Sequence, residues 1–403
     1  KWPPQQIDLP SFCSQGTLGA SRYLSMQDIQ RFNAIDSFRG LCALSVVIFH
    51  MNVAGAFSEI SFFRNSDIFV DFFFILSGFV LAHSYGLRKH LDFKKFLVSR
   101  TFRLFPLHLT MLAVFIILES GKYIAHQKGF DFNNIPFTGT FAPSEIVPNA
   151  LLIQSWTNFT SATSFNYPAW SISIEYHMYL IFAAFTILSL KFRLFAWIAT
   201  MVVMLGLLYA ESDLMTNPAM RGLSCFFGGC VSYLAYCKIK QSVRLGYWTM
   251  TLLEASSLIV VAGFVASDIS NKPSIAIVLF CSVVILFAFD AGGISKVLRI
   301  PPMQYIGKIS YSIYMTHAAI LFCLTSAIMV MQKATGIGLT RMIDGARYID
   351  LGGAATSNAL VIAAVVVVIA LSSLTFRCIE VPGQKIGRKF STYRVEEPGS
   401  QPA

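Results

Sequence analysis

The sequence predicts an all-α protein, a polytopic membrane bundle of about ten transmembrane helices. The 403 residues are 55% hydrophobic and 13% charged, a balance that soluble domains rarely reach. The mean hydropathy is +0.60, and apolar runs of membrane-spanning length recur along the chain. A net charge of +10 is also compatible with nucleic-acid binding. Because the basic residues lie in short clusters between apolar runs, they indicate membrane topology and no nucleic-acid partner.

Ten apolar runs of roughly 17 to 25 residues are long enough to cross a bilayer. They cover residues 40–56, 68–87, 103–124, 169–190, 193–210, 219–237, 247–266, 273–289, 305–330 and 358–378. If the N-terminus is cytoplasmic and the loops alternate, all but eight of the 31 Lys and Arg fall on the cytoplasmic side. This bias predicts that both ends of the chain face the cytoplasm.

The chain divides into three predicted parts. Residues 1–31 form a polar leader without the long apolar run of a secretory signal, 32–382 form the membrane domain, and 383–403 form a short cytoplasmic tail. The longest outside segment, about 122–168, is rich in Asn, Thr, Ser, Phe and Pro, which suits a lid or a polar substrate surface. The eight Cys are scattered and show no metal-ligand spacing, so we expect no metal.

The first run, "RGLCALSVVIFH", begins on an arginine and ends on a histidine. Eleven residues separate Arg39 from His50, which brings both side chains to one face of a helix, and Asp36 shares that face. His50 then lies roughly 16 Å beyond Arg39, near the middle of the bilayer. An imidazole at that depth is a functional candidate, although a histidine that only links helices by hydrogen bonds would look the same.

The second and third runs carry further polar residues. Asp71 and Gly78 share one helix face and Ser77 precedes the glycine, so this helix offers a carboxylate near its outer end. Ser77 and Gly78 suit either a packing seam or a direct substrate contact. Arg100 and Arg103, at the cytoplasmic start of the third run, suit either membrane anchoring or bidentate phosphate binding.

The later runs add five polar residues on two helix faces. Ser171 and Glu175 share a face just inside the predicted outer end of the fourth run, where the carboxylate is either a structural ion-pair partner or a catalytic or acceptor-binding group. Ser310, Tyr314 and His317 share another face, which places His317 about as deep as His50.

Glu380 lies near the cytoplasmic edge of the tenth run, where an interfacial salt bridge with Arg39 or its neighbours is the favoured interpretation.

Several segments, in order, resemble the acyltransferase-3 family of integral membrane acyltransferases, from about residue 32 to 382. They are "IDSFRGLCALSVVIFH", "VDFFFILSGFVL", the pair Arg100 and Arg103 followed by "LFPLHL", "AWSISIE" with Trp170, "ISYSIYMTH" and the closing Glu380-Val381-Pro382. Any one of these is weak in apolar sequence, but together in this order they are specific. Some members carry a fused extracytoplasmic hydrolase-like domain. This sequence shows none, so a stand-alone enzyme is implied.

The resemblance implies O-acyl transfer, with acetyl as the expected group, from cytoplasmic acyl-CoA to a hydroxyl of an extracytoplasmic or cell-surface glycan or glycolipid. It also implies an integral protein of the bacterial inner membrane. His50 and Glu175 are then the catalytic candidates, and Arg39, Arg100 and Arg103 hold the coenzyme. The remaining residues are pocket or structural candidates: Asp36, Asp71, Ser77, Gly78, Trp170, Ser171, Tyr314, His317 and Glu380.

Two questions stay open at this stage. His50 either removes the acceptor's proton or carries the acyl group itself. A proton-coupled transporter or flippase-like carrier is the rival class, since histidines in the membrane also relay protons. No repeated halves with matching broken helices support that rival.

Overall fold

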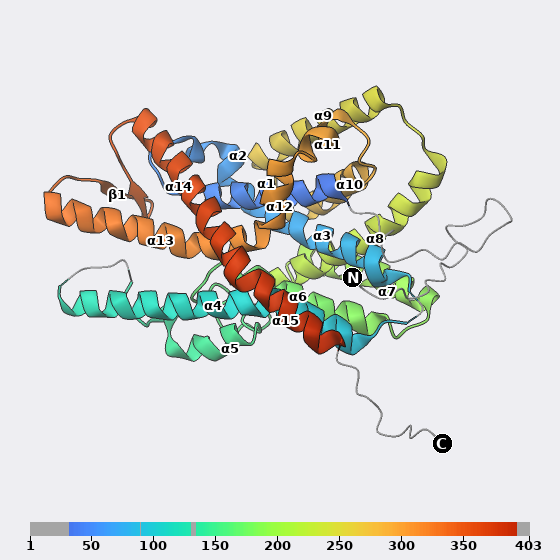
Figure 1. Ribbon diagram of the computed structural model, residues 1–403, viewed down its shortest axis with the longest axis horizontal. Helices are drawn as coiled ribbons and strands as arrows, with labels where there is room; N and C mark the ends of the chain where they lie inside the picture. Colours follow the sequence, from blue (N-terminus) through green and yellow to red (C-terminus); the bar gives the residue numbers. More distant parts are fainter. Residues whose placement is uncertain (1–31, 89, 130–133, 393–403) are drawn as a thin grey trace, which may run out of the picture.

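A computed structural model describes residues 32–88, 90–129 and 134–392. The predicted leader 1–31 and the end of the predicted tail, 393–403, lie outside these residues. The described chain is helical apart from one small hairpin, which confirms the all-α class (Figure 1).

Ten long helices correspond to the ten predicted runs. They are α1 (Asn33–Phe49), α3 (Phe69–Leu81), α4 (Phe93–Gln127), α6 (Ala169–Phe185), α7 (Leu190–Tyr209), α8 (Asn217–Ser242), α9 (Tyr247–Ala266), α10 (Lys272–Ala288), α13 (Ser310–Thr335) and α14 (Ala354–Thr375). The shorter helices are α2 (Ser61–Arg64), α5 (Ile146–Ala150), α11 (Gly293–Leu298), α12 (Pro301–Lys308) and α15 (Val381–Thr392). Five-residue π-helical segments, Ala82–Gly86 and Phe376–Glu380, extend α3 and α14.

Within the described ranges, seven helical segments are long and apolar enough to cross a membrane. They are Ser66–Gly86, Phe93–Gln127, Leu190–Tyr209, Asn217–Ser242, Tyr247–Ala266, Ser310–Thr335 and Ala354–Ser391. The other three predicted runs form α1, α6 and α10, each of 17 residues. The number of spans and their orientation therefore stay predictions.

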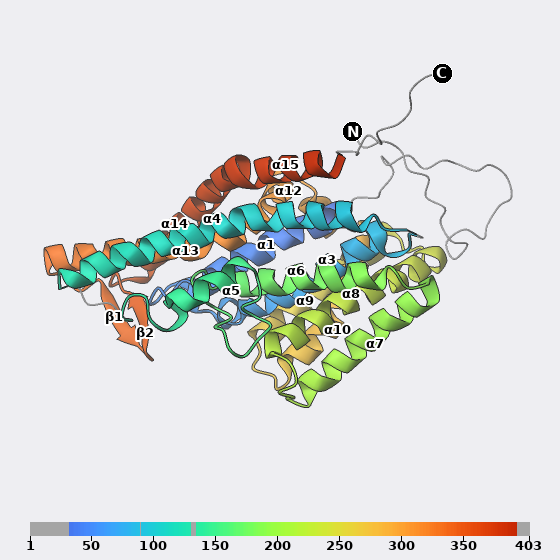
Figure 2. The ribbon, with the colours of Figure 1, turned by 90° about the horizontal axis from the view of Figure 1, so that it is seen from below.

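Helix α1 lies inside the bundle and packs against α3, α12 and α13 (Figures 1 and 2). Close approach to α12 depends on glycine, because a Cβ on Gly307 would lie 2.1 Å from the Asp36 carbonyl oxygen. Helix α1 ends at Phe49, seven residues before the end of the predicted run 40–56. The chain then leaves the helix because residues 52–54 hydrogen-bond to Ile349.

The hairpin of β1 (Thr340–Ile343) and β2 (Ala346–Ile349) is antiparallel, with Thr340 opposite Ile349. The Ile349 N–H donates to the Asn52 carbonyl at 2.9 Å, and the Ala54 N–H donates to the Ile349 carbonyl at 2.8 Å. The hairpin is therefore bonded to the segment that directly follows His50.

Residues 142–168, part of the predicted lid, turn into the bundle instead of covering it. Leu152, Asn149 and Phe165 are almost completely buried. The Asn166 amide donates to the Met315 carbonyl on α13 at 3.1 Å, and the Trp156 indole donates to the Ser173 carbonyl at 3.2 Å. The segment therefore folds back against α6 and α13, and Ala169 at the start of α6 is fully buried.

The boundary predicted at residue 382 falls inside a helical run, because α15 begins at Val381 and continues to Thr392. A Cβ on Gly383 or Gly387 would approach side-chain atoms of α4 within 2.6 Å. The start of the predicted tail is therefore a helix packed on α4.

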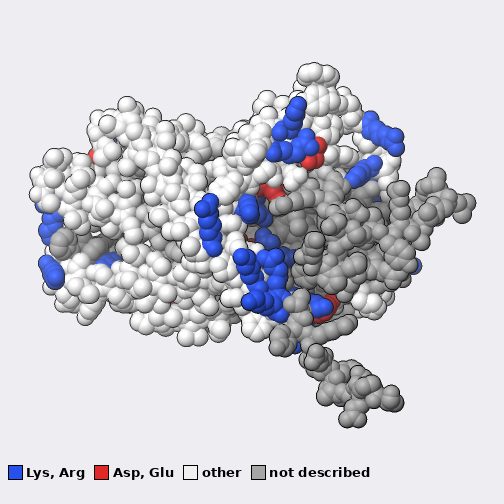
Figure 3. All heavy atoms as spheres, viewed as in Figure 1, with Lys and Arg blue, Asp and Glu red and all other residues white. Residues whose placement is uncertain are grey.

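Lys and Arg gather on the half of the molecule where α12 and α15 lie, and a broad face without charge separates them from the few at the β1 end (Figure 3). A charge-free band is what the hydrocarbon core of a bilayer requires. This face agrees with the charge pattern of the sequence.

Candidate active site

Arg39 is held between α1, α12 and α13. Its Nε donates to the Ser310 hydroxyl at 2.8 Å, and its Nη2 donates to the Gly307 carbonyl at 3.1 Å. These bonds fix the guanidinium against the start of α13, and Asp36 lies one turn earlier on α1.

His50 caps the other end of α1 and meets His317 of α13, with His50 Nδ1 and His317 Nε2 3.3 Å apart. Arg39 and His50 therefore both contact the face that carries Ser310 and His317. The two ends of the predicted stripe thus contact one helix, and the roles of Arg39 and His50 stay predictions.

The hydrogen bonds of the two rings assign their tautomers. His317 Nδ1 lies 2.7 Å from the Tyr314 carbonyl, which can only accept, so the proton of His317 is on Nδ1. His50 Nδ1 lies 2.9 Å from the Val46 carbonyl, so it carries the proton and shares it with His317 Nε2. The Nε2 of His50 is then left with a lone pair that can accept a proton.

Tyr167, at the end of the segment 142–168, packs against both histidines. Its ring centroid lies 4.6 Å from that of His50 and 5.7 Å from that of His317. Sequence analysis missed Tyr167 because only tertiary folding brings residues 142–168 to this depth.

Arg39 also faces a cavity of about 330 Å³, which we call the basic pocket. Its charged lining residues are Asp36, Arg39, Arg100, Arg103, Lys308 and Glu380. Four cations and two acids leave an excess of positive charge. Lys308 was not among the site residues predicted from the sequence.

Arg100 is fixed in this pocket by aromatic rings. Its guanidinium carbon lies 5.4 Å from the ring centroids of Phe96 and Tyr179 and 5.6 Å from that of Tyr85. Such contacts restrain the side chain while its polar edge stays available. This arrangement favours a binding role for Arg100 over simple membrane anchoring.

A second cavity, the inner pocket, continues from the basic pocket. It has a volume of about 60 Å³ and shares Arg39, Ser77 and Arg103 with the basic pocket. Its deeper lining residues include Ser171, Glu175, Ser310, Tyr311 and Tyr314. The two pockets therefore adjoin at these three residues, and together we call them the passage.

Glu175 lies beside this passage. Ser77 donates to its Oε1 at 2.9 Å, and the Tyr179 hydroxyl donates to the same oxygen. Glu175 was expected near the outer end of its span. That position is corrected, because Glu175 lines the same cavity as Arg39, which begins the first predicted span. Its hydrogen-bond partners are hydroxyl groups, and Tyr179 was missed although its four-residue spacing from Glu175 places it on the same helix face.

The deep end of the inner pocket is next to the histidines. Ser171 and Tyr314 are hydrogen-bonded through their hydroxyls at 2.9 Å. Tyr314 is three residues before His317, about 4.5 Å along the helix axis. The passage therefore ends within one helical turn of the histidine pair.

Glu380 lies at the opposite, wide end, where the π-helical segment Phe376–Glu380 ends. It accepts from the Ser312 hydroxyl at 2.8 Å and from the Gln384 amide at 3.1 Å. It shares the basic pocket with Arg39, but no ion pair between them is present among the described residues. The favoured salt bridge with Arg39 is therefore replaced by these two hydrogen bonds.

Besides the two histidines, three predicted residues line neither pocket. Asp71 is fully buried and pairs with Arg221 of α8 at 2.6 Å. Gly78 belongs to a packing seam, since a Cβ there would lie 1.8 Å from the Phe226 carbonyl oxygen. Trp170 packs edge-to-face on Phe74.

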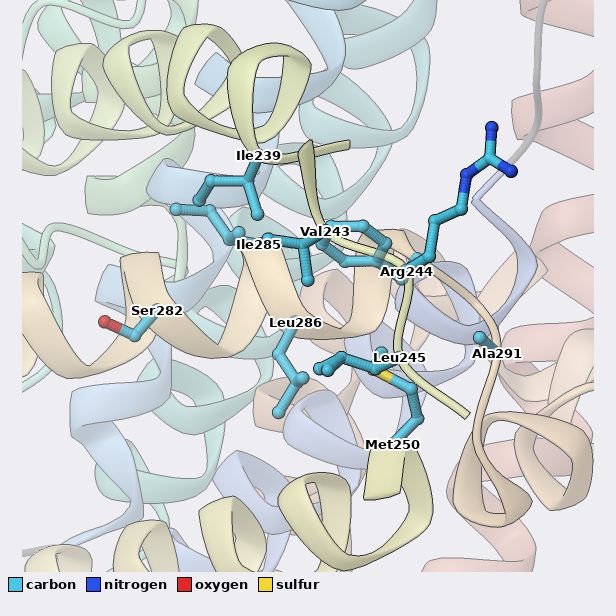
Figure 4. A pocket seen from close by; sticks show the side chains of 10 residues that line it. Ile239, Val243, Arg244, Leu245, Met250, Ser282, Ile285, Leu286 and Ala291 are labelled. Carbon is cyan, nitrogen blue, oxygen red and sulfur yellow. The ribbon is translucent and has the colours of Figure 1, made fainter. Parts of the chain in front are cut away.

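A separate apolar pocket lies among α8, α9 and α10, where the Arg244 guanidinium extends away from Leu286 and its apolar neighbours (Figure 4). It contains none of the predicted site residues. Among the residues that the structure describes, no group of three His, Cys, Asp or Glu side chains gathers as metal ligands would.

The fold and the site together define a class: a helical membrane protein with a basic pocket that narrows toward paired histidines. The profile of acyltransferase family 3, described as an acyltransferase domain, matches residues 32–377. The chain therefore belongs to this family of membrane acyltransferases, which favours an enzyme over a carrier.

Two curated relatives illustrate the likeness. The chain is 22% identical to the "Peptidoglycan O-acetyltransferase OatA" of Listeria monocytogenes over 342 residues, which cover 74% of the chain and 51% of the relative. It is 25% identical to the "Acyltransferase MdmB" of Streptomyces mycarofaciens over 323 residues, covering 73% of the chain and 80% of the relative. The chain thus spans about half the length of the Listeria protein. No solved structure matches the chain significantly.

Proposed function

We propose that the chain transfers an acyl group, expected to be acetyl, from cytoplasmic acyl-CoA to a hydroxyl of an extracytoplasmic glycan or glycolipid. The expected location is the inner membrane of a bacterium. Membership of the acyltransferase family and the named activity of the Listeria relative support the reaction class.

The passage from the basic pocket to the histidines is the observation that carries the proposal. Acyl-CoA is an elongated molecule with phosphates at one end and a thioester at the other. The passage has the matching polarity, with four cations at its wide end and His50 beyond its narrow end.

The cations at the wide end suit the phosphates of the coenzyme. Guanidinium groups bind phosphate oxygens through pairs of charge-assisted hydrogen bonds. Arg39 is already oriented by Ser310 and Gly307, so little conformational freedom is lost when it binds. The pantetheine arm then runs along α1 for the roughly 16 Å that separate Arg39 from His50.

The histidine pair suits the transfer step. In direct transfer, the oxygen of the acceptor hydroxyl attacks the thioester carbonyl while His50 Nε2 takes the proton of that hydroxyl. The C–S bond breaks, and the coenzyme thiolate takes the proton back from the imidazolium. In the two-step route, His50 Nε2 attacks the thioester carbonyl and the C–S bond breaks, which releases the coenzyme thiolate and leaves an acyl-imidazolium. The acceptor oxygen then attacks this acyl group, the bond from the acyl carbon to Nε2 breaks, and the proton of the acceptor hydroxyl passes to the coenzyme thiolate. Glu175 is positioned to orient Ser77 and Tyr179 beside the arm.

Titration of acetyl-CoA into purified protein in nanodiscs tests the donor assignment. Arg100→Ala and Arg103→Ala each remove charge-assisted hydrogen bonds, so we expect affinity to fall about tenfold or more. Arg244→Ala is the matched control, since it removes an arginine far from the basic pocket and should leave affinity unchanged. Equal affinity in all variants, or no binding by the unaltered protein, would overturn the donor assignment.

A further inference from the structure

Another cavity lies at the opposite end of the molecule from the basic pocket, between α4 and α13. It has a volume of about 960 Å³ and runs along both helices, which lie side by side toward β1 (Figures 1 and 2). From α13 its walls include Phe322, Ser326 and Lys333. We call it the lateral groove.

The lateral groove is apolar along its length and faces outward. Ile117 and Val330 line it and are 68% and 56% exposed, as expected for side chains that face lipid. Gly121 lies midway along the α4 wall, and a Cβ there would meet no atom within 4 Å. The groove therefore has open space for a hydrocarbon chain.

One end of the groove is basic. Lys333 and Arg347 lie at this end, Lys122 lies beside Gly121 midway along the α4 wall, and none of the described lining residues is acidic. Lys122 is buried and paired with Glu119 at 3.2 Å, whereas Lys333 is exposed and lies beside the end of α4. An apolar channel with a cationic end suits an amphiphile whose polar end carries phosphate.

The basic end is connected to the histidine pair by the hairpin. Arg347 lies on β2 two residues before Ile349, which hydrogen-bonds to the segment that follows His50. Along this path the Cα atoms of Arg347 and His50 are within about 20 Å of each other. A short oligosaccharide attached to a phosphate at the basic end can span that distance.

We infer that the lateral groove binds the acceptor as a lipid-linked glycan, with the hydrocarbon chain between α4 and α13 and its phosphate beside Lys333 and Arg347. This inference rests on the proposed function and names the acceptor class: a glycan still attached to its lipid, before incorporation into a polymer. It requires that acetylated glycan be found first in the lipid-extractable fraction.

Gly121→Trp tests the groove, because the indole fills open space without displacing neighbouring atoms. Gly263→Trp is the matched control, since Gly263 is an exposed helical glycine of α9 whose Cβ also meets nothing within 4 Å. Lys333→Gln removes one charge at the basic end. The probes are farnesyl phosphate, uncharged farnesol and phosphatidylglycerol, each added to the protein in phosphatidylcholine nanodiscs.

We expect farnesyl phosphate to bind more tightly than farnesol or phosphatidylglycerol. In Gly121→Trp, displacement of about three methylene groups lowers affinity about fiftyfold. In Lys333→Gln, loss of one cation lowers affinity about fivefold. Gly263→Trp leaves it unchanged. In membranes supplied with radiolabelled acetyl-CoA, Gly121→Trp should lose label in lipid-extractable glycan yet bind acetyl-CoA normally.

Three results would overturn the inference. Equal binding of phosphatidylglycerol would make the groove a site for ordinary anionic phospholipid. Unchanged transfer by Gly121→Trp would separate the groove from the reaction. Label that enters only polymeric glycan would exclude a lipid-linked acceptor. Each leaves acetyl-CoA binding intact, whereas failure of the proposed function abolishes that binding in the unaltered protein.

Discussion

Replacement of His317 by leucine should slow acyl transfer without weakening donor binding. His317 Nε2 accepts the hydrogen bond from His50 Nδ1, and leucine has no acceptor. The side chain is fully buried, so a substitution of similar bulk limits the structural damage. His317 lines neither the basic nor the inner pocket, so we expect KM for acetyl-CoA to stay the same.

The size of the effect follows from the charge that His50 acquires. A neutral hydrogen bond contributes about 0.5–1.5 kcal/mol, and one to a charged group about 1.5–3 kcal/mol. The bond therefore strengthens by about 1–1.5 kcal/mol when His50 becomes an imidazolium, which corresponds to about a five- to tenfold effect on kcat. His317→Gln retains an acceptor oxygen and should recover part of that loss.

The assay measures transfer of radiolabelled acetyl groups in membrane vesicles that contain equal amounts of folded protein, with thermal unfolding as the control for structure. An unchanged kcat in His317→Leu would refute the assigned hydrogen bond. Equal losses in His317→Leu and His317→Gln would reduce His317 to a packing residue.

Three further outcomes are expected. His50→Ala should lower the transfer rate by about 10²–10⁴ if His50 is a general base, and acyl-enzyme trapping distinguishes the two-step route. Gly78→Ala should lower the yield of folded protein on size-exclusion chromatography, because its Cβ would lie 1.8 Å from a backbone oxygen of Phe226. Arg193→Met should lower the melting temperature by removing a buried guanidinium bonded to four carbonyl oxygens, a loss of about 3 kcal/mol or more.

The helices and one line of polar residues could be predicted from the sequence, because both depend on local periodicity. Each predicted apolar run corresponds to a helix. The eleven-residue step from Arg39 to His50 and the seven-residue step from Ser310 to His317 describe two helix faces that meet. Periodicity within single helices thus predicted the two faces and the similar depth of the two histidines, while their contact is seen only in the structure.

The remaining features depend on contacts that no local pattern encodes. Residues 142–168 look like an exposed loop, yet tertiary hydrogen bonds draw them inward and so bring Tyr167 to His50. From the sequence, Asp71 is a plausible pocket residue, but in the structure it forms an ion pair with Arg221 of α8. The sequence does not distinguish a packing role of Gly78 from a substrate contact, whereas the structure shows that α8 approaches it closely.

The narrowness of the inner pocket has a consequence for what can cross the membrane together with the acyl group. At about 60 Å³ it has room for roughly two water molecules. A hydrated ion would have to shed its water to pass, whereas a slender acyl arm threads in without leaving an aqueous pore. Under the proposed function, a chemical group changes sides of the membrane at a point too narrow for a hydrated ion.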